Sequence, residues 1–84
     1  MKQKHGWYIM KAIKDKPLTI YEIIDIINNS GELLGGITIS QTRMAIRELW
    51  LYGYIKKERI ERYLLKYSVM KPINAQSDLK LNNF

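Results

Sequence analysis

The chain has 84 residues and no cysteine, so it can form one small domain but neither a disulfide nor a thiolate metal site. The formal net charge of +6 and the isoelectric point near 9.7 indicate a polyanionic partner. No apolar run reaches the ~18 residues that a membrane span needs, and the N-terminus lacks the apolar segment of a secretory signal. We therefore expect a cytoplasmic protein that does not enter the membrane.

The positive charge is unevenly distributed along the chain. Residues 1–16 carry a net charge of +4, residues 17–39 carry −3 and residues 56–62 carry +2. The N-terminus and the second half of the chain are therefore basic, whereas the segment between them is acidic. We expect the basic parts to bind the partner; an ordinary solvated basic surface is the alternative.

We predict a first helix over residues 4–15. Apolar side chains at Ile9, Ala12 and Ile13 have helical spacing and would face the core. The helix should end before Pro17, because the residue that precedes a proline disfavours the α conformation.

A second helix is predicted to begin at Thr19. The Thr19-x-x-Glu22 spacing is that of a capping box, in which each side chain accepts a hydrogen bond from the other residue's backbone. The sequence 28–31, Asn-Asn-Ser-Gly, should end the helix. Its core face would be formed by four isoleucines: Ile20, Ile23, Ile24 and Ile27.

The next segment, residues 30–37, is predicted to be a loop. Its two adjacent glycines lack the spacing of a phosphate-binding loop, and no strand is predicted before them. We expect Leu33 and Leu34 to pack the loop against the core, with room for a very short strand at Ile37 or Ile39.

The central helix, residues 38–53, has the clearest signals. Thr38-x-x-Gln41 has capping-box spacing, and Gly53 stands where a left-handed residue commonly ends a helix. One stripe is apolar, with Ala45, Ile46 and Leu49. The side chains that point away from this stripe are Gln41, Arg43, Met44 and Arg47.

A β-hairpin is predicted for residues 55–69, with its turn around residues 60–62. The alternation of Tyr63, Leu65, Tyr67 and Val69 is typical of a half-buried strand. Glu58 and Glu61 are interpreted as cross-strand partners of basic residues. After the hairpin, residues 71–84 are polar and breaker-rich, and we expect a flexible tail. The basic residues of the hairpin are Lys56, Lys57, Arg59 and Arg62.

Two stretches resemble a known family. Ser40-Gln41-Thr42-Arg43 begins the central helix, and Gly53-Tyr54-Ile55-Lys56 leads from it into a basic hairpin. This order is similar to the winged helix-turn-helix DNA-binding superfamily, with a weaker likeness to PadR-type regulators in residues 21–24 and in the glycine-containing loop. The resemblance implies an α+β fold over residues 1–70, in which three helices precede a two-stranded hairpin, the wing.

The resemblance also implies a function, namely a transcriptional regulator that binds double-stranded DNA sequence-specifically. Helix 38–53 would enter the major groove, where arginine can donate twice to guanine and glutamine can pair with adenine. Thr42 has an alternative role as a small core residue, and Met44 could likewise belong to the core. The expected DNA-binding residues are Ser40 and Thr42 for phosphates; Gln41, Arg43, Met44 and Arg47 for bases; and Lys56, Lys57, Arg59 and Arg62 for the backbone or the minor groove.

Other functions stay open at this stage. The same fold could be a protein-interaction module that uses an apolar cluster formed by Trp50, Leu51, Tyr52 and Tyr54, which also suggests a homodimer; one or two of the four must belong to the core. A plasmid or viral replication protein is a third possibility, and the isoleucine- and lysine-rich composition favours a mobile element. We expect no enzyme, cofactor or metal site, because the single histidine, His5, has no catalytic partners and no acidic cluster is evident.

Overall fold

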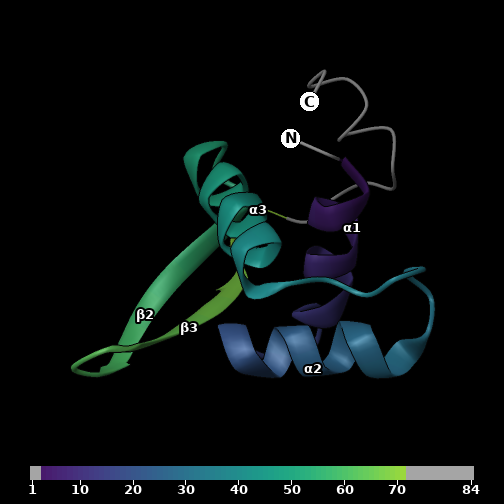
Figure 1. Ribbon diagram of the computed structural model, residues 1–84. Helices are drawn as coiled ribbons and strands as arrows, with labels where there is room; N and C mark the ends of the chain where they lie inside the picture. The colour runs from purple at the N-terminus through teal and green to yellow at the C-terminus, as the bar shows by residue number, and fades with distance from the viewer. Residues whose placement is uncertain (1–2, 72–84) are drawn as a thin grey trace.

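Three helices surround one hydrophobic core, and an antiparallel sheet of three strands packs against it (Figure 1). The structure is a computed structural model that describes residues 3–71. The flexible tail expected for residues 71–84 lies, apart from Lys71, outside the described residues. The elements are α1 (Gln3–Ala12), β1 (Leu18–Thr19), α2 (Ile20–Ser30), α3 (Ile39–Leu51), β2 (Ile55–Glu61) and β3 (Leu64–Val69).

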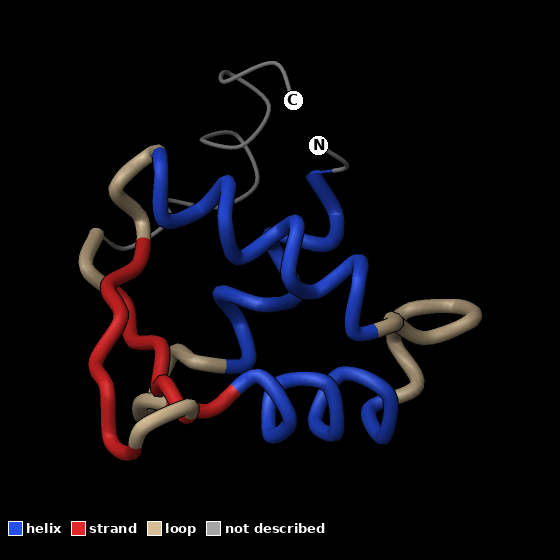
Figure 2. The backbone as a smooth tube through the Cα atoms, turned by 60° about the vertical axis from the view of Figure 1, so that its left-hand side comes forward, coloured by secondary structure: helices blue, strands red, loops and turns tan. Residues whose placement is uncertain are grey.

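The α+β class is confirmed, but the two-stranded sheet is corrected to three strands. β1 pairs with β3 through Leu18 opposite Tyr67 and Thr19 opposite Lys66, which gives the strand order β1-β3-β2 (Figure 2). Thr19 is the N-cap of α2 and is extended, as an N-cap must be, so the residues before the helix can pair as a strand. No strand forms at Ile39, because this residue already begins α3.

Both predicted capping boxes are present. The Thr19 Oγ1 accepts from the backbone N–H of Glu22 at 3.2 Å, and the Glu22 carboxylate accepts from the backbone N–H of Thr19 at 2.8 Å. That backbone hydrogen bond lowers the pKa of Glu22 below its ordinary 4.5. Thr38 and Gln41 make the same exchange at 3.1 and 2.9 Å, so α3 begins where predicted.

The ends of α1 and α3 follow simple backbone rules. α1 ends at Ala12, earlier than residue 15, because the backbone N–H of Lys14 bonds three residues back and tightens the last turn. Gly53 has φ 82°, the left-handed conformation predicted for it after α3.

Leu33 and Leu34 differ in burial, although both were expected to pack against the core. The N–H of Gly36 donates to the carbonyl of Leu33 at 2.9 Å and closes a turn with Leu34 and Gly35 at its corner. Gly35 has φ 83°, which such a turn needs at its third residue. Leu33 is therefore buried, whereas Leu34 is 98% exposed.

One side-chain amide fixes the start of α3 relative to α2. Asn28, near the end of α2, accepts from the N–H of Ile37 at 2.7 Å and donates to its carbonyl at 3.2 Å. Gly36 has φ 69°, and a Cβ placed on it would lie 2.7 Å from the Asn28 Oδ1. The loop can therefore approach α2 this closely only because residue 36 is glycine.

We predict that Gly36→Ala destabilises the protein more than Gly35→Ala. Both changes force alanine into a left-handed conformation, at ~1–2 kcal/mol each. Only the methyl at position 36 also strikes Asn28, whereas nothing lies within 4 Å of position 35, so Gly36→Ala should cost ~1 kcal/mol more through the disturbed hydrogen bonds. Urea unfolding measures the difference, and equal losses would show that the Asn28 contact is dispensable.

Candidate nucleic-acid interface

The outer side of α3 carries five of the six residues predicted there. Its inner stripe is buried and consists of Thr42, Ala45, Ile46 and Leu49. This leaves the opposite side in solvent, with Met44 70% exposed. The other exposed members of the predicted set on this helix are Ser40, Gln41, Arg43 and Arg47.

The expected phosphate contact of Thr42 is corrected by its burial. Its side chain is fully buried, and the Oγ1 donates to the carbonyl of Thr38 at 2.7 Å. A hydroxyl enclosed in this way cannot reach a partner at the surface. Thr42 has instead the core role that its sequence position left open.

Gln41 is exposed, but part of its side chain is already used. Its Oε1 accepts from the backbone N–H of Thr38 in the capping box at 2.9 Å. A bidentate contact with adenine needs both the oxygen and the nitrogen of the amide. The oxygen keeps a second lone pair, so such a contact would have to be made in the orientation that the cap imposes, whereas no capping bond restrains Arg43, Met44 and Arg47 in this way.

Arg43 and Arg47 lie one helical turn apart and have different surroundings. Burial raises the pKa of Tyr67 in β3 above its ordinary 10.0, and the positive charge of Arg43 opposes that rise. Arg47, one turn further on, lies on the solvent side of the helix.

The β2–β3 hairpin follows the C-terminal end of α3 (Figure 2). A cation–π contact joins the hairpin to this helix. The Lys57 Nζ lies 3.9 Å from the centre of the Trp50 ring. Lys57 is also opposite Tyr67 in the sheet, so both lie on the face of the hairpin that is turned towards α3. The contact between Lys57 and Trp50 thereby connects the helix to the hairpin.

The charges of the hairpin are only partly balanced. Glu58 lies opposite Lys66, which confirms the cross-strand partner expected for it. Glu61 lies opposite Leu64, so the basic partner expected for it is wrong. The exposed basic residues of β2 and the turn are Lys56, Lys57, Arg59 and Arg62.

A bulge explains the shifted turn of the hairpin. Arg59 pairs with Leu65 and Glu61 with Leu64, so Ile60 is an extra residue in β2. The two strands are consequently joined by residues 62–63, not around residues 60–62.

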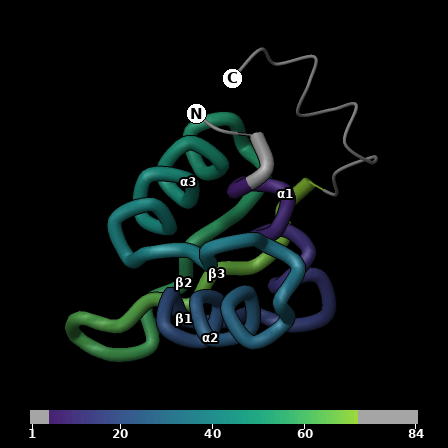
Figure 3. Tube along the Cα trace, turned by 45° about the vertical axis from the view of Figure 1, so that its right-hand side comes forward, coloured from purple at the N-terminus to yellow at the C-terminus, as the bar shows by residue number. Residues whose placement is uncertain are grey.

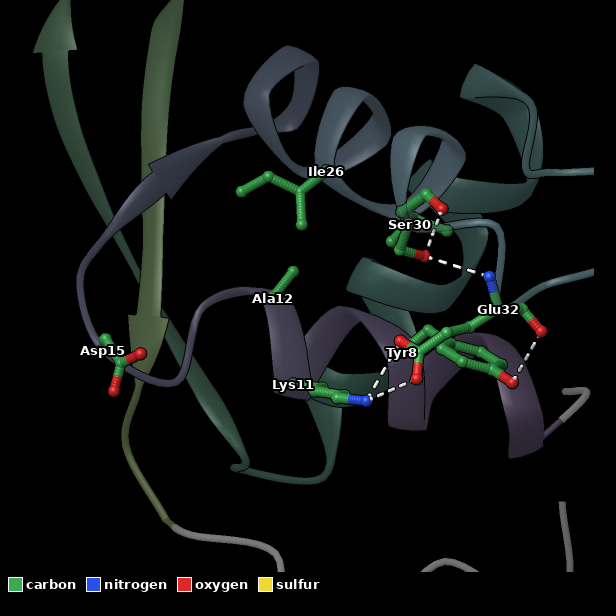
Figure 4. A pocket seen from close by; sticks show the side chains of 8 residues that line it. Tyr8, Lys11, Ala12, Asp15, Ile26, Ser30 and Glu32 are labelled. Carbon is green, nitrogen blue, oxygen red and sulfur yellow. Dashed lines mark hydrogen bonds and ion pairs between the residues drawn. The ribbon is translucent and has the colours of Figure 1, made fainter.

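Between α1 and α2 lies an open hollow of about 250 Å³ (Figure 4). The Lys11 ammonium pairs with the Glu32 carboxylate at 2.7 Å, and the Tyr8 hydroxyl donates to the Glu32 carbonyl at 3.3 Å. The charge of Lys11 is therefore balanced here. The hollow adds no basic surface to the one formed by α3 and the hairpin.

Comparison with known proteins finds no match among protein-family models, curated proteins or solved structures. Within residues 3–71, no helix has the length and apolar character needed to cross a bilayer. The same residues contain no group of three histidine or acidic side chains placed to hold a metal ion.

Sequence reasoning missed the residues that hold the interface together. Trp50 was interpreted as apolar surface and Lys57 as a DNA contact, although the two side chains meet. Asn28 was interpreted as part of a helix stop, although it anchors the loop before α3. Only the alternation of β3 pointed to Tyr67 as an inward-facing residue.

We predict that Lys57→Gln weakens the attachment of the hairpin to α3. Loss of the contact with Trp50 should lower the free energy of unfolding by ~0.5–1 kcal/mol and speed amide hydrogen exchange in β2 and β3. Lys56→Gln removes the same charge from the other face of the strand and is the matched control. If the two variants behave alike, the contact contributes nothing specific.

We also predict that Arg43→Gln raises the pKa of Tyr67 further. The arginine stabilises the phenolate, so its removal leaves the effect of burial unopposed. NMR titration of tyrosines labelled at Cζ would measure this value. Arg47→Gln is the control, and an equal shift in both variants would contradict the placement of Arg43 beside β3.

Proposed function

We propose that the protein is a winged helix-turn-helix protein that binds double-stranded DNA sequence-specifically and acts as a transcriptional regulator. In this proposal α3 lies in the major groove and the β2–β3 hairpin is the wing. The observation that carries the proposal is the pair of exposed arginines on α3 beside a cationic hairpin that is attached to the same helix.

The shape of α3 suits the major groove. The groove is ~12 Å wide and admits one α-helix, whose N-terminal half reaches the base edges. Arg43 and Met44 lie in this half of α3, and Arg47 lies one turn beyond Arg43; all three side chains are exposed. Either arginine can donate twice to guanine, and Met44 can contact the methyl group of thymine.

The charge distribution supports a DNA-facing side formed by α3 and the hairpin over one formed by α2. Residues 17–39, which include α2, contain three acidic residues and no lysine or arginine. Residues 40–62 contain six basic and three acidic residues. A duplex would therefore be attracted to the side formed by α3 and the hairpin and repelled by α2.

A second candidate function is protein binding through the end of α3. Trp50, Leu51 and Tyr52 are 44, 60 and 52% exposed, so apolar side chains are accessible around the C-terminal end of α3. Tyr54, which was expected on this surface, is only 4% exposed and belongs to the core. The partner could be a second copy of the chain. A plasmid or viral replication protein would use the same DNA contacts as a regulator.

We predict that the protein binds duplex DNA with a steep salt dependence and with base preference. A site selected from random duplexes should lose ~1–3 kcal/mol of preference at one position in Arg47→Ala, because a base contact is lost. Lys56→Ala should weaken all sequences about equally and reduce the salt slope by ~1. Fluorescence anisotropy measures both effects.

Leu51→Ser separates the two candidate functions. The side chain is uncharged and 60% exposed at the end of α3, outside the proposed DNA contacts, so the change should leave DNA affinity intact. The protein-binding candidate is favoured if the protein does not bind duplex DNA even in 50 mM salt. It is also favoured if Leu51→Ser abolishes the protein's biological activity while Arg47→Ala leaves that activity intact.

A further inference from the structure

The distal half of the β2–β3 hairpin is a two-stranded ribbon outside the three-stranded sheet. β1 pairs only with Tyr67 and Lys66 of β3, so residues 59–65 pair with nothing but one another. Figure 3 shows this tip reaching beyond the helices. Side chains there contribute little to the core.

The tip combines exposed apolar side chains with arginines. Tyr63, in the turn, is 90% exposed, and Ile60, the bulge residue, is 45% exposed. Arg59 and Arg62 stand directly before these two residues, and Glu61 is the one acidic residue among residues 59–65. A phenol ring in water adds almost no stability to an isolated ribbon, so the fold itself does not account for this pair.

We propose that Ile60 and Tyr63 form an apolar wedge that enters the minor groove of the bound duplex and partly unstacks one base step. This inference rests on the proposed function and adds to it a preference for a particular kind of base step. The negative potential of the groove would hold Arg59 and Arg62, while the wedge opens the step. The preferred ligand is then a duplex with an easily unstacked pyrimidine–purine step, such as TA, beside the sequence that α3 reads.

The surrounding aromatic residues favour a duplex over single-stranded nucleic acid. Proteins that hold single strands stack successive bases on several accessible rings. Here Tyr67 is half-buried, Tyr54 is buried and Lys57 lies over the Trp50 ring, while the exposed Tyr52 stands at the end of α3, outside the hairpin. Tyr63 is thus the one accessible ring of the described hairpin that no cation covers, which fits a single wedge better than a stacking platform.

The test uses the full chain and an AT-rich 30-base-pair duplex with 2-aminopurine at a central TA step and a dye at each end. Wild-type protein should raise the 2-aminopurine fluorescence and bring the dyes closer together. In Tyr63→Ser both signals should disappear, and the affinity should fall at least roughly fivefold, the loss expected when an aromatic ring no longer packs on bases. Ile60→Ser should weaken the same signals.

Two controls separate the effect of losing the wedge from the effect of losing charge and from a general loss of structure. Tyr21→Ser removes a tyrosine that is 59% exposed on α2, and it should behave like wild type. Tyr63→Ser should keep the wild-type salt slope, because no charge is lost, whereas Arg62→Ala should reduce the slope by about 1.

The outcomes distinguish the wedge from the proposed function. If wild type and Tyr63→Ser bind the duplex with the same salt slope and give the same two signals, the wedge is wrong and DNA binding stands. Absence of duplex binding in wild type overturns both. Tighter binding of the matching single strand, with a loss in Tyr63→Ser, would replace the wedge by base stacking.

Discussion

The burial of one stripe of α3 is the constraint on which the rest of the structure depends. Ala45, Ile46 and Leu49 are at most 4% exposed, and Thr42 is fully enclosed beside them. In a helix of 3.6 residues per turn, the rotation that buries these positions also places Met44 and Arg47 in solvent. The packing that buries this stripe therefore also exposes the proposed DNA contacts. For this reason the small core of so short a chain is enough to hold a basic surface in place.

Two contacts outside that stripe give α3 its position among its neighbours. Asn28 anchors the loop that precedes the helix, and Lys57 on Trp50 attaches the hairpin that follows it. Both are polar contacts near the surface, where each contributes little to stability. Their effect is geometric, because Asn28 limits the movement of α3 relative to α2 and Lys57 limits that of the hairpin relative to α3. A duplex that must contact both elements benefits from this limit, since less ordering remains to be done on binding.

Local patterns predicted most of the fold. Thr19 with Glu22 and Thr38 with Gln41 form the capping boxes that their spacing indicated, because such bonds involve residues only three apart. The predictions that were wrong concern pairing between residues that are far apart in the sequence. β1 consists of two residues that pair with β3, nearly fifty positions later, and no periodicity can be read from two residues. The bulge at Ile60, which moved the turn, is likewise a property of the paired strands.

For the candidate site, the amino-acid sequence by itself determined which face of α3 is polar, that the hairpin is basic and that the preceding helix is acidic. These follow from helical spacing and charge, which are local properties. Only the tertiary structure decided that Thr42 and Tyr54 are enclosed and that Lys57 contacts Trp50. It also decided that the hairpin tip, residues 59–65, extends beyond the part of β3 that pairs with β1. The physical reason is that burial and contact depend on which distant segments pack together, and a single sequence carries no direct record of that packing.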